Sequence, residues 1–347
     1  MRLIPISAAT DPLLEVRDLQ VRIPTRRGDL LAVDGVDLTV GAGEIVGVVG
    51  ESGSGKTLTA YAIMGLLSAP AVISRGVIRF RGQDLQALAA EERGRMRGSA
   101  MSMVFQEPLT ALNPVFPVGT QIRDVIRRHT NLSDRSIRGR ILELLDHVGI
   151  AGPERVAAAY PFELSGGMRQ RILIAMAIAC GPSLVIADEP TTALDTTIQA
   201  QILELLRRLV RDDGISLLLI SHDFGIVADL CQRVYVMYAG QVVEHATAGQ
   251  LFDRPRHPYT SALLGCMPAA RDGDAPLDTI EGTVPTVIDP KALCRFADRC
   301  GYAQARCTEQ SPPRQTFGVV QDALCFRAAE LTLPGLVTPS LTDGVLP

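Results

Sequence analysis

The segment GESGSGKT, residues 50–57, has the residue types and spacing of a loop that binds phosphate. It lies between the apolar run EIVGVV and the helical pattern LTAYAIMGLL, so backbone N–H groups and a helix N-terminus can face an anion. Lys56 is placed to reach the β- and γ-phosphates, and the Thr57 hydroxyl to bind Mg²⁺. We therefore predict a nucleoside triphosphate site rather than a plain glycine-rich turn with a surface lysine. The loop residues assigned to it are Gly50, Ser52, Gly53, Ser54, Gly55, Lys56 and Thr57.

Two adjacent carboxylates stand at the end of the apolar run SLVIADEP. A hydrophobic strand that delivers an acid beside a phosphate loop is the second metal-binding element of such ATPases, so we expect Asp188 to hold Mg²⁺. Glu189, one position later, is placed to polarise a water for attack. An acidic turn is the alternative interpretation, and the phosphate loop makes it the weaker one.

The segment ELSGGMRQR, residues 163–171, predicts a second anion site. Ser165, Gly166 and Gly167 precede the helical run MRQRILIAMAIAC, so their N–H groups lie at a helix N-terminus. One nucleotide does not need two phosphate-binding helix starts in a single fold. We therefore expect this second start to serve a nucleotide held by another subunit, although an ordinary serine N-cap would also explain the serine and glycines.

The order of GESGSGKT, Gln106, LSGGMRQR, ADEP, ALD (193–195) and His222 resembles the nucleotide-binding subunit of an ABC transporter from residue 13 to 250. The resemblance implies ATP as the nucleotide, and implies that Gln106 touches Mg²⁺ and reports to a membrane subunit. It also implies that Ser165 and Gly167 contact the γ-phosphate of the partner's ATP. By the same resemblance, Asp195 lines the dimer seam and His222 holds the γ-phosphate and the attacking water.

Three further segments, YPFELSGG, FQEPLTALNP and RHPYTSALLGCMP, resemble the importers of dipeptides and oligopeptides. The resemblance implies an ATPase at the cytoplasmic face of the inner (plasma) membrane. Its implied partners are a second ABC ATPase, identical or different, two transmembrane permeases and an extracytoplasmic substrate-binding protein. The alternatives are an importer of nickel or another small solute, and a soluble ABC ATPase of iron–sulfur assembly. A DNA-repair ATPase would need a long coiled coil, and Glu189 and His222 argue against a non-hydrolysing partner.

The sequence departs from this family at the base of the nucleotide. Relatives often place an aromatic ring near residue 27 to stack on adenine, whereas this chain has IPTRRGD there. Arg26 or Arg27 could lay a guanidinium plane on the base instead.

Short apolar runs alternate with helical patterns around these motifs. The expected strands, apolar on both faces as buried parallel strands are, lie at residues 44–50, 101–106, 183–189, 216–222 and 233–240. We predict an α/β fold: a P-loop ATPase core with a mostly parallel sheet, an antiparallel β patch in the first forty residues and a helical subdomain at about 107–180.

Prolines become frequent after about residue 255, and the hydrophobic periodicity fades there. The expected domains are a nucleotide-binding domain at 1–255 and a small irregular C-terminal domain at 256–330. That second domain is the extension typical of oligopeptide transporters. A loose tail is expected at 331–347.

Composition and the N-terminal sequence predict a cytosolic protein. The net charge of −4 gives no electrostatic footprint for nucleic acid, and no run of eighteen apolar residues is present. The N-terminal sequence MRLIPISAATDP has a proline and polar residues where a signal peptide needs an apolar core. Thiols stay reduced in the cytosol, so disulfides are not expected.

Four cysteines gather in the extension: Cys294, Cys300, Cys307 and Cys325. Grouped thiolates can bind zinc or a [4Fe–4S] cluster, but the gaps between these are longer than in the usual zinc pairs and differ from ferredoxin runs. Four unligated thiols therefore remain possible on spacing alone. The resemblance to dipeptide-importer ATPases implies a [4Fe–4S] cluster, with zinc as the alternative. Cys180, Cys231 and Cys266 lie in helical or apolar stretches and are expected to be small core residues.

Overall fold

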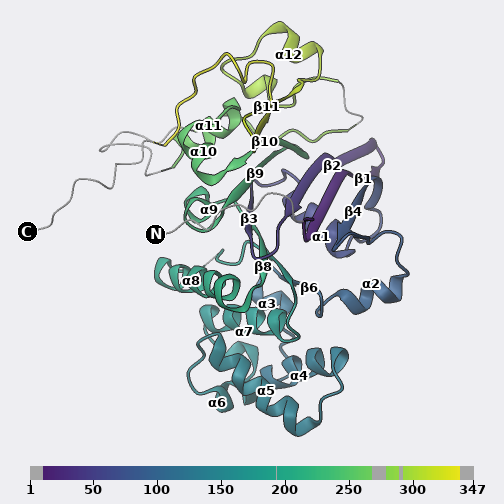
Figure 1. Ribbon diagram of the computed structural model, residues 1–347, viewed down its shortest axis with the longest axis vertical. Helices are drawn as coiled ribbons and strands as arrows, with labels where there is room; N and C mark the ends of the chain where they lie inside the picture. The colour runs from purple at the N-terminus through teal and green to yellow at the C-terminus, as the bar shows by residue number, and fades with distance from the viewer. Residues whose placement is uncertain (1–10, 193, 268–278, 289–291, 337–347) are drawn as a thin grey trace, which may run out of the picture.

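The computed structural model describes residues 11–192, 194–267, 279–288 and 292–336. Its strands form two sheets, one of eight strands in the order β11-β12-β10-β9-β3-β8-β7-β6 and one of four in the order β2-β1-β4-β5. Figure 1 shows helices gathered around the larger sheet, with the smaller sheet beside it. This arrangement confirms the predicted α/β class.

The centre of the larger sheet is parallel. Its five parallel strands are β3 (Ile45–Val49), β6 (Met101–Val104), β7 (Leu184–Asp188), β8 (Ser216–Ser221) and β9 (Arg233–Tyr238). Successive residues of β3 enter different cores: Val46 and Val48 pack with the small sheet, while Ile45 and Val49 pack with the helical side. Both faces are therefore buried, which is why these strands read as continuous apolar runs. All five coincide with the expected strands.

The smaller sheet is antiparallel. Its strands are β1 (Leu14–Thr25), β2 (Gly28–Val40), β4 (Val72–Phe80) and β5 (Gln83–Asp84). The β1–β2 hairpin is the predicted patch, and its turn lies at the TRRGD segment. Helix α1 (Lys56–Met64) packs between the two sheets, with Ala60 and Ile63 in a shared core.

Most remaining helices cover the other face of the parallel sheet or form a group at one end of the molecule (Figure 1). Ile122, Ile126, Ile141 and Leu144 join that end group to the core of the parallel sheet. The group falls inside the expected helical subdomain and comprises α3 (Pro108–Ala111), α4 (Val118–His129), α5 (Asp134–His147), α6 (Pro153–Ala158), the 3₁₀ turn η1 (Pro161–Glu163) and α7 (Gly166–Ile178). The others are α2 (Ala90–Met96), α8 (Thr196–Asp213), α9 (Phe224–Leu230) and α10 (Ala248–Asp253).

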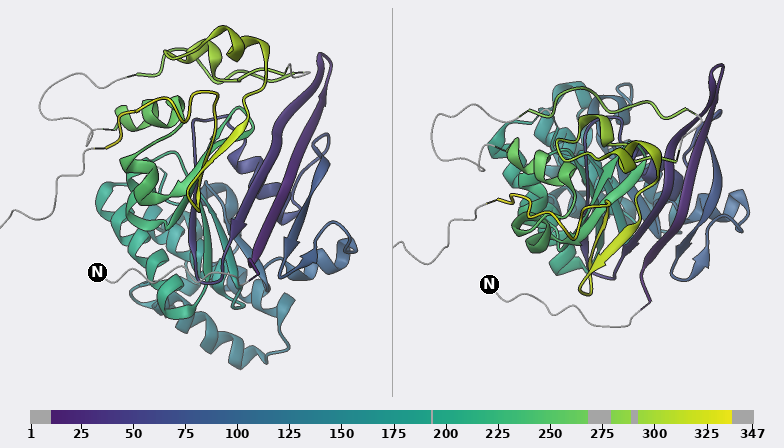
Figure 2. Two further views of the ribbon diagram at one scale, coloured as in Figure 1. Left: turned by 45° about the horizontal axis from the view of Figure 1, so that its top comes forward. Right: turned by 90° about the horizontal axis from the view of Figure 1, so that it is seen from above.

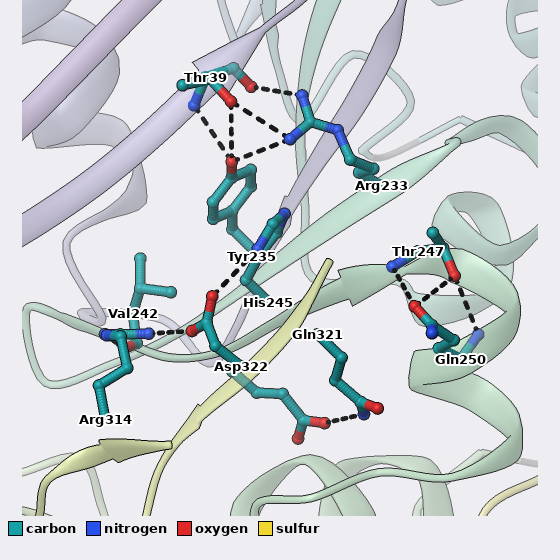
Figure 3. Close-up of polar contacts among 11 residues, drawn as sticks. Thr39, Arg233, Tyr235, Val242, His245, Thr247, Gln250, Arg314, Gln321 and Asp322 are labelled. Atoms are coloured by element: carbon teal, nitrogen blue, oxygen red, sulfur yellow. Dashed lines mark hydrogen bonds and ion pairs between the residues drawn. The ribbon is translucent and has the colours of Figure 1, made fainter. Parts of the chain in front are cut away.

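The C-terminal extension adds to the core sheet. Strand β10 (Gln241–Thr247) pairs with β9 on one side and with β12 (Gln321–Leu324) on the other, and β12 pairs with β11 (Arg314–Phe317). Figure 3 shows Asp322 of β12 between His245 and Arg314, and the His245 Nδ1–Asp322 Oδ2 distance is 3.2 Å. The extension also contains α11 (Pro258–Gly265), the 3₁₀ turn η3 (Ala297–Arg299) and α12 (Ala305–Glu309). It is thus tied to the core by backbone pairing as well as by side chains.

The predicted loose tail lies partly outside the described residues, which end at residue 336. The described part is held in place: Leu333 is buried, and the Leu336 N–H donates to the Phe252 carbonyl at 2.8 Å. Within the described segments, no helix combines the length and apolar character needed to cross a bilayer.

Candidate functional site

The phosphate loop connects β3 to α1 and depends on glycine at two positions. Gly50 and Gly55 have φ of 150° and 102°, a region that side chains rarely allow. A Cβ at Gly50 would lie 2.1 Å from the Met237 carbonyl oxygen, and one at Gly55 would lie 2.5 Å from the Ala32 carbonyl oxygen. The close approach of these two neighbouring backbones therefore requires glycine at both positions and holds the loop in one curved conformation.

Lys56 lies inside this curve, with 6% of its surface exposed. Its Nζ donates to the carbonyls of Gly50 at 2.7 Å and Glu51 at 2.9 Å. Burial lowers the pKa of Lys56, while nearby carboxylates, chiefly that of Glu189, act in the opposite direction. A cation held this way is available to an anion that enters the loop.

Asp188 ends β7 directly beside Thr57. The Thr57 Oγ1 donates to Asp188 Oδ1 at 3.3 Å, and Asp188 is 1% exposed. Burial raises the pKa of Asp188. A hydroxyl and a carboxylate oxygen at this spacing are the hard oxygen donors that Mg²⁺ prefers.

Glu189 is oriented by three neighbours. Its Oε2 accepts from Gln106 Nε2 and from Thr192 Oγ1, both at 2.9 Å, and its Oε1 lies 3.2 Å from His222 Nδ1. The backbone of Glu189 has φ of 47°, an uncommon value outside glycine. Three elements of the parallel sheet thus bring Gln106, Glu189 and His222 together, as the carboxyl ends of parallel strands should.

A cavity of about 450 Å³ opens over the phosphate loop. This volume lies within the range of ordinary ligand pockets. Phosphate-loop residues, Gln106 and Glu189 form one part of its lining, and the other part comes from the β1–β2 hairpin and the extension. Among the described residues, the lining consists of Ile23, Leu30, Leu31, Ala32, Ser52, Gly53, Ser54, Gly55, Lys56, Thr57, Leu58, Gln106, Glu189 and residues 283–287.

The segment predicted as a second anion site does not line this cavity. The Ser165 side chain caps α7 by accepting from the Met168 N–H at 3.3 Å, and Ser165 and Gly166 are exposed whereas Gly167 is buried. Asp195 caps α8 by accepting from the Ile198 N–H at 2.9 Å and is also exposed. Neither helix start contributes to the described lining of the cavity. Ala193, which precedes Leu194 and Asp195 in the motif, lies outside the described residues.

The structure adds two contacts on the phosphate loop that the sequence did not predict. The Tyr259 hydroxyl accepts from the Glu51 N–H at 2.9 Å, and Arg299 donates to both Glu51 carboxylate oxygens at 2.8 and 2.9 Å. Both residues come from the extension and are almost fully buried. The RHPYT segment resembles peptide importers and so drew attention to Tyr259, but its role as a hydrogen-bond partner depends on the fold. The sequence analysis assigned no role to Arg299.

The four cysteines of the extension line one small cavity of about 20 Å³. None of them forms a disulfide, and burial raises the pKa of Cys294 to about 11. Backbone N–H groups point at two of the sulfurs, from Gln304 to Cys307 at 3.5 Å and from Arg327 to Cys325 at 3.3 Å. Even so, in the part of the chain that the structure describes, no three His, Cys, Asp or Glu side chains are grouped closely enough to hold a metal ion.

Comparisons with known proteins agree with this geometry. Residues 33–192 match the ABC transporter family, and residues 243–307 match the family described as the oligopeptide/dipeptide transporter C-terminal region. The dipeptide transport ATP-binding protein DppD of Haemophilus influenzae is 44% identical, covering 88% of this chain and 93% of that protein. The chain belongs to the dipeptide/oligopeptide family of ABC-transporter ATP-binding proteins. Its nucleotide is therefore ATP with Mg²⁺, and its reaction is ATP hydrolysis.

Other relatives of this ABC ATPase point the same way. The oligopeptide transport ATP-binding protein AppD of Bacillus subtilis is 45% identical, covering 90% of this chain and 96% of that protein. A dimeric post-hydrolysis structure of the cassette MJ0796 with ADP and Pi is 26% identical with a TM-score of 0.62, covering 68% of this chain and 98% of the other. These relatives do not support the nickel importer or the iron–sulfur assembly ATPase considered from the sequence.

Proposed function

We propose that this ATPase works as one half of a two-ATPase dimer that powers the import of di- and oligopeptides. The observation that carries the proposal is that the phosphate loop and the helix start at Ser165, both predicted to bind phosphate, do not share a cavity. The phosphate loop and its acids form one cavity, while the helix start at Ser165 faces solvent elsewhere. The site around an ATP bound to the loop is completed when the partner's helix start at Ser165 covers that ATP, so ATP binding drives closure of the dimer.

The polar groups assigned to this site take different parts in phosphoryl transfer. Loop N–H groups and Lys56 would stabilise the β- and γ-phosphate charge, and Thr57, Asp188 and Gln106 would hold Mg²⁺. Glu189 accepts the proton of the attacking water, because its carboxylate is held by donors on both oxygens and is aimed over the loop. His222 orients that water and the γ-phosphate. Asp195 at the start of α8 lies at the seam between the two ATPases.

The proposed partners of this ATPase follow from its family. The transport ATP-binding relatives support action on membrane subunits, and we propose two permeases and an extracytoplasmic substrate-binding protein as partners. The relatives named for dipeptide and oligopeptide transport support peptides as the cargo. The chain would then lie peripherally at the cytoplasmic face of the inner membrane.

The test is Glu189→Gln in the assembled transporter. Glutamine keeps the shape and the contact with Thr192 but cannot accept a proton, so ATP binding should persist and turnover should fall by roughly 10²–10⁴-fold. The measurements are ATP affinity by calorimetry and phosphate release. Glu204→Gln, a change in an exposed ion pair on α8, is the matched control. Hydrolysis within about threefold of wild type would refute the assignment of Glu189 as the base.

We also propose that Cys294, Cys300, Cys307 and Cys325 hold a [4Fe–4S] cluster. The resemblance to dipeptide-importer ATPases carries this proposal, with support from the shared cavity and from the N–H groups directed at two sulfurs. The described thiols are not grouped as a site for a single metal ion, so the proposal concerns a cluster held by four thiolates. A bound cluster would supply structural cross-linking to a region with little core of its own.

Anaerobic purification tests the cluster. A brown protein with about four irons per chain is expected, lost in Cys300→Ser and kept in Cys180→Ser, which changes a thiol beside α4. A colourless protein with stoichiometric zinc, or with no metal, would contradict the proposal.

A further inference from the structure

One wall of the ATP cavity comes from the C-terminal extension. Residues 283–287 line it together with Ile23, Leu30, Leu31 and Ala32 of the β1–β2 hairpin. Figure 2 shows the extension passing beside that hairpin. The segment pairs with β2, because the Leu31 N–H donates to the Val287 carbonyl at 3.0 Å and Leu30 forms an antiparallel bridge with Ile288.

Arg299 fixes the start of this segment to the phosphate loop. Its guanidinium donates to the carbonyls of Ile280 at 3.2 Å, Glu281 at 2.8 Å and Gly282 at 3.4 Å, directly before the wall. The same guanidinium forms the two-pronged contact with Glu51, and its side chain is 7% exposed. A single buried fork therefore joins the wall to the loop, a geometry that lysine cannot reproduce.

The chemistry of the lining separates the two ends of the nucleotide. The loop, Lys56 and Thr57 take the phosphates, and Gln106 and Glu189 lie at the γ end, so the base must lie against the remaining lining. Most of that remainder is aliphatic: Ile23 and Leu30 from the hairpin, with Val284, Pro285 and Val287 from the extension, beside the two threonines Thr283 and Thr286. Arg26 and Arg27 are exposed in the hairpin turn and do not line the cavity in the described structure.

We propose that the extension supplies the nucleobase wall of the ATP site, with Val284 and Pro285 packing on the purine opposite Ile23 and Arg299 acting as the positioning residue. Aliphatic side chains pack on the face of a purine and exclude water from it, so no aromatic ring is needed at the hairpin. The proposal rests on ATP binding at the phosphate loop.

A tryptophan reporter tests the wall directly, because the chain has no tryptophan of its own. In full-length Val284→Trp, Mg-ATP should change the tryptophan emission saturably, with a midpoint equal to the dissociation constant from calorimetry. Mg-tripolyphosphate, which fills the phosphate loop without a base, should leave the emission unchanged. Val319→Trp, at a position 97% exposed in the same extension, is the matched control and should respond to neither ligand.

Arg299→Gln tests the positioning role. Loosening the wall should weaken ATP binding by about fivefold, which is the loss of ~1 kcal/mol of apolar contact, while tripolyphosphate affinity stays within about twofold. Arg299→Lys should restore part of the ATP affinity. Arg306→Gln, which removes a half-exposed ion pair in the same extension, is the control.

Two results would overturn the proposal. One is a tryptophan emission of Val284→Trp that does not change at saturating ATP, or that changes equally with tripolyphosphate. The other is an Arg299→Gln variant that loses both ligands to the same extent, because Arg299 would then act on the loop through Glu51 alone. The emission experiment stands by itself if Arg299→Gln does not fold.

Discussion

The buried carboxyl group of Glu244 leads to a prediction of how the stability of this ATPase changes with pH. It lies on β10 with no exposed surface, and its carboxylate accepts from the N–H groups of Arg256 at 2.7 Å and His257 at 2.9 Å and from Gln321 Nε2 at 3.1 Å. Burial raises its pKa from 4.5 to about 7, although these hydrogen bonds act in the opposite direction. The folded protein therefore holds the Glu244 proton more tightly than the unfolded chain does.

The sign and size of the effect follow from linkage. A raised pKa adds stability that is fully present below about pH 4.5 and is lost as the pH rises through about 7. Between pH 5.5 and 8 this single group should lower the free energy of unfolding by about 2 kcal/mol. His257 acts in the opposite direction, because burial lowers its pKa from 6.5 to about 3, so over part of this range the unfolded chain binds a proton that the folded protein does not. A comparison with a variant that changes only Glu244 removes this contribution.

Urea unfolding of the wild type and of Glu244→Gln at several pH values is the assay. Glutamine does not titrate, so the stability difference between the two proteins should shift by about 2 kcal/mol between pH 5.5 and 8, while contributions from other groups cancel. Glu91→Gln, a change in an exposed ion pair on α2, should give a constant difference. A Glu244→Gln difference that is flat over this range would refute the assignment.

Four further changes are predicted. Lys56→Ala should abolish ATP binding at micromolar nucleotide, measured by calorimetry, because the β/γ charge is left uncompensated. Ser165→Ala should spare binding by the isolated chain and impair hydrolysis by the assembled dimer; equal damage to monomer binding by both changes would contradict a shared site. Gly55→Ala should also lose ATP binding while keeping its far-UV circular dichroism, since its Cβ would meet the Ala32 carbonyl. Ile126→Ala, in the helical core, should cost about 2–5 kcal/mol of stability with unchanged ATP affinity.

The parallel core and the phosphate loop could be predicted because local patterns determine them. The strand that carries Asp188 is apolar along its length, and the loop glycines signal close backbone approach, so period and composition suffice. The meeting of Gln106, Glu189 and His222 was implied by family resemblance. The structure gives the physical reason, which is that all three follow adjacent parallel strands.

The contacts made by the extension could not be predicted in the same way. Arg299 reaches Glu51 across 248 positions, and β12 pairs with β10 across a proline-rich stretch without strong periodicity. Strands as short as β11 and β12 leave too few residues for an alternating pattern to stand out. Long-range pairing of this kind is decided by the assembled fold rather than by local sequence.

The route of the chain through the ATP cavity has a consequence for its synthesis on the ribosome. The phosphate loop is translated early, whereas the Val287 carbonyl that pairs with β2 and the Arg299 guanidinium that binds Glu51 are made much later, Arg299 248 residues after Glu51. Contacts between such distant segments form late, because the intervening chain must first be made and closed into a loop. A nascent chain that stops before the extension thus carries a phosphate loop without its far wall, and full nucleotide affinity arises only once the extension has been made and has folded.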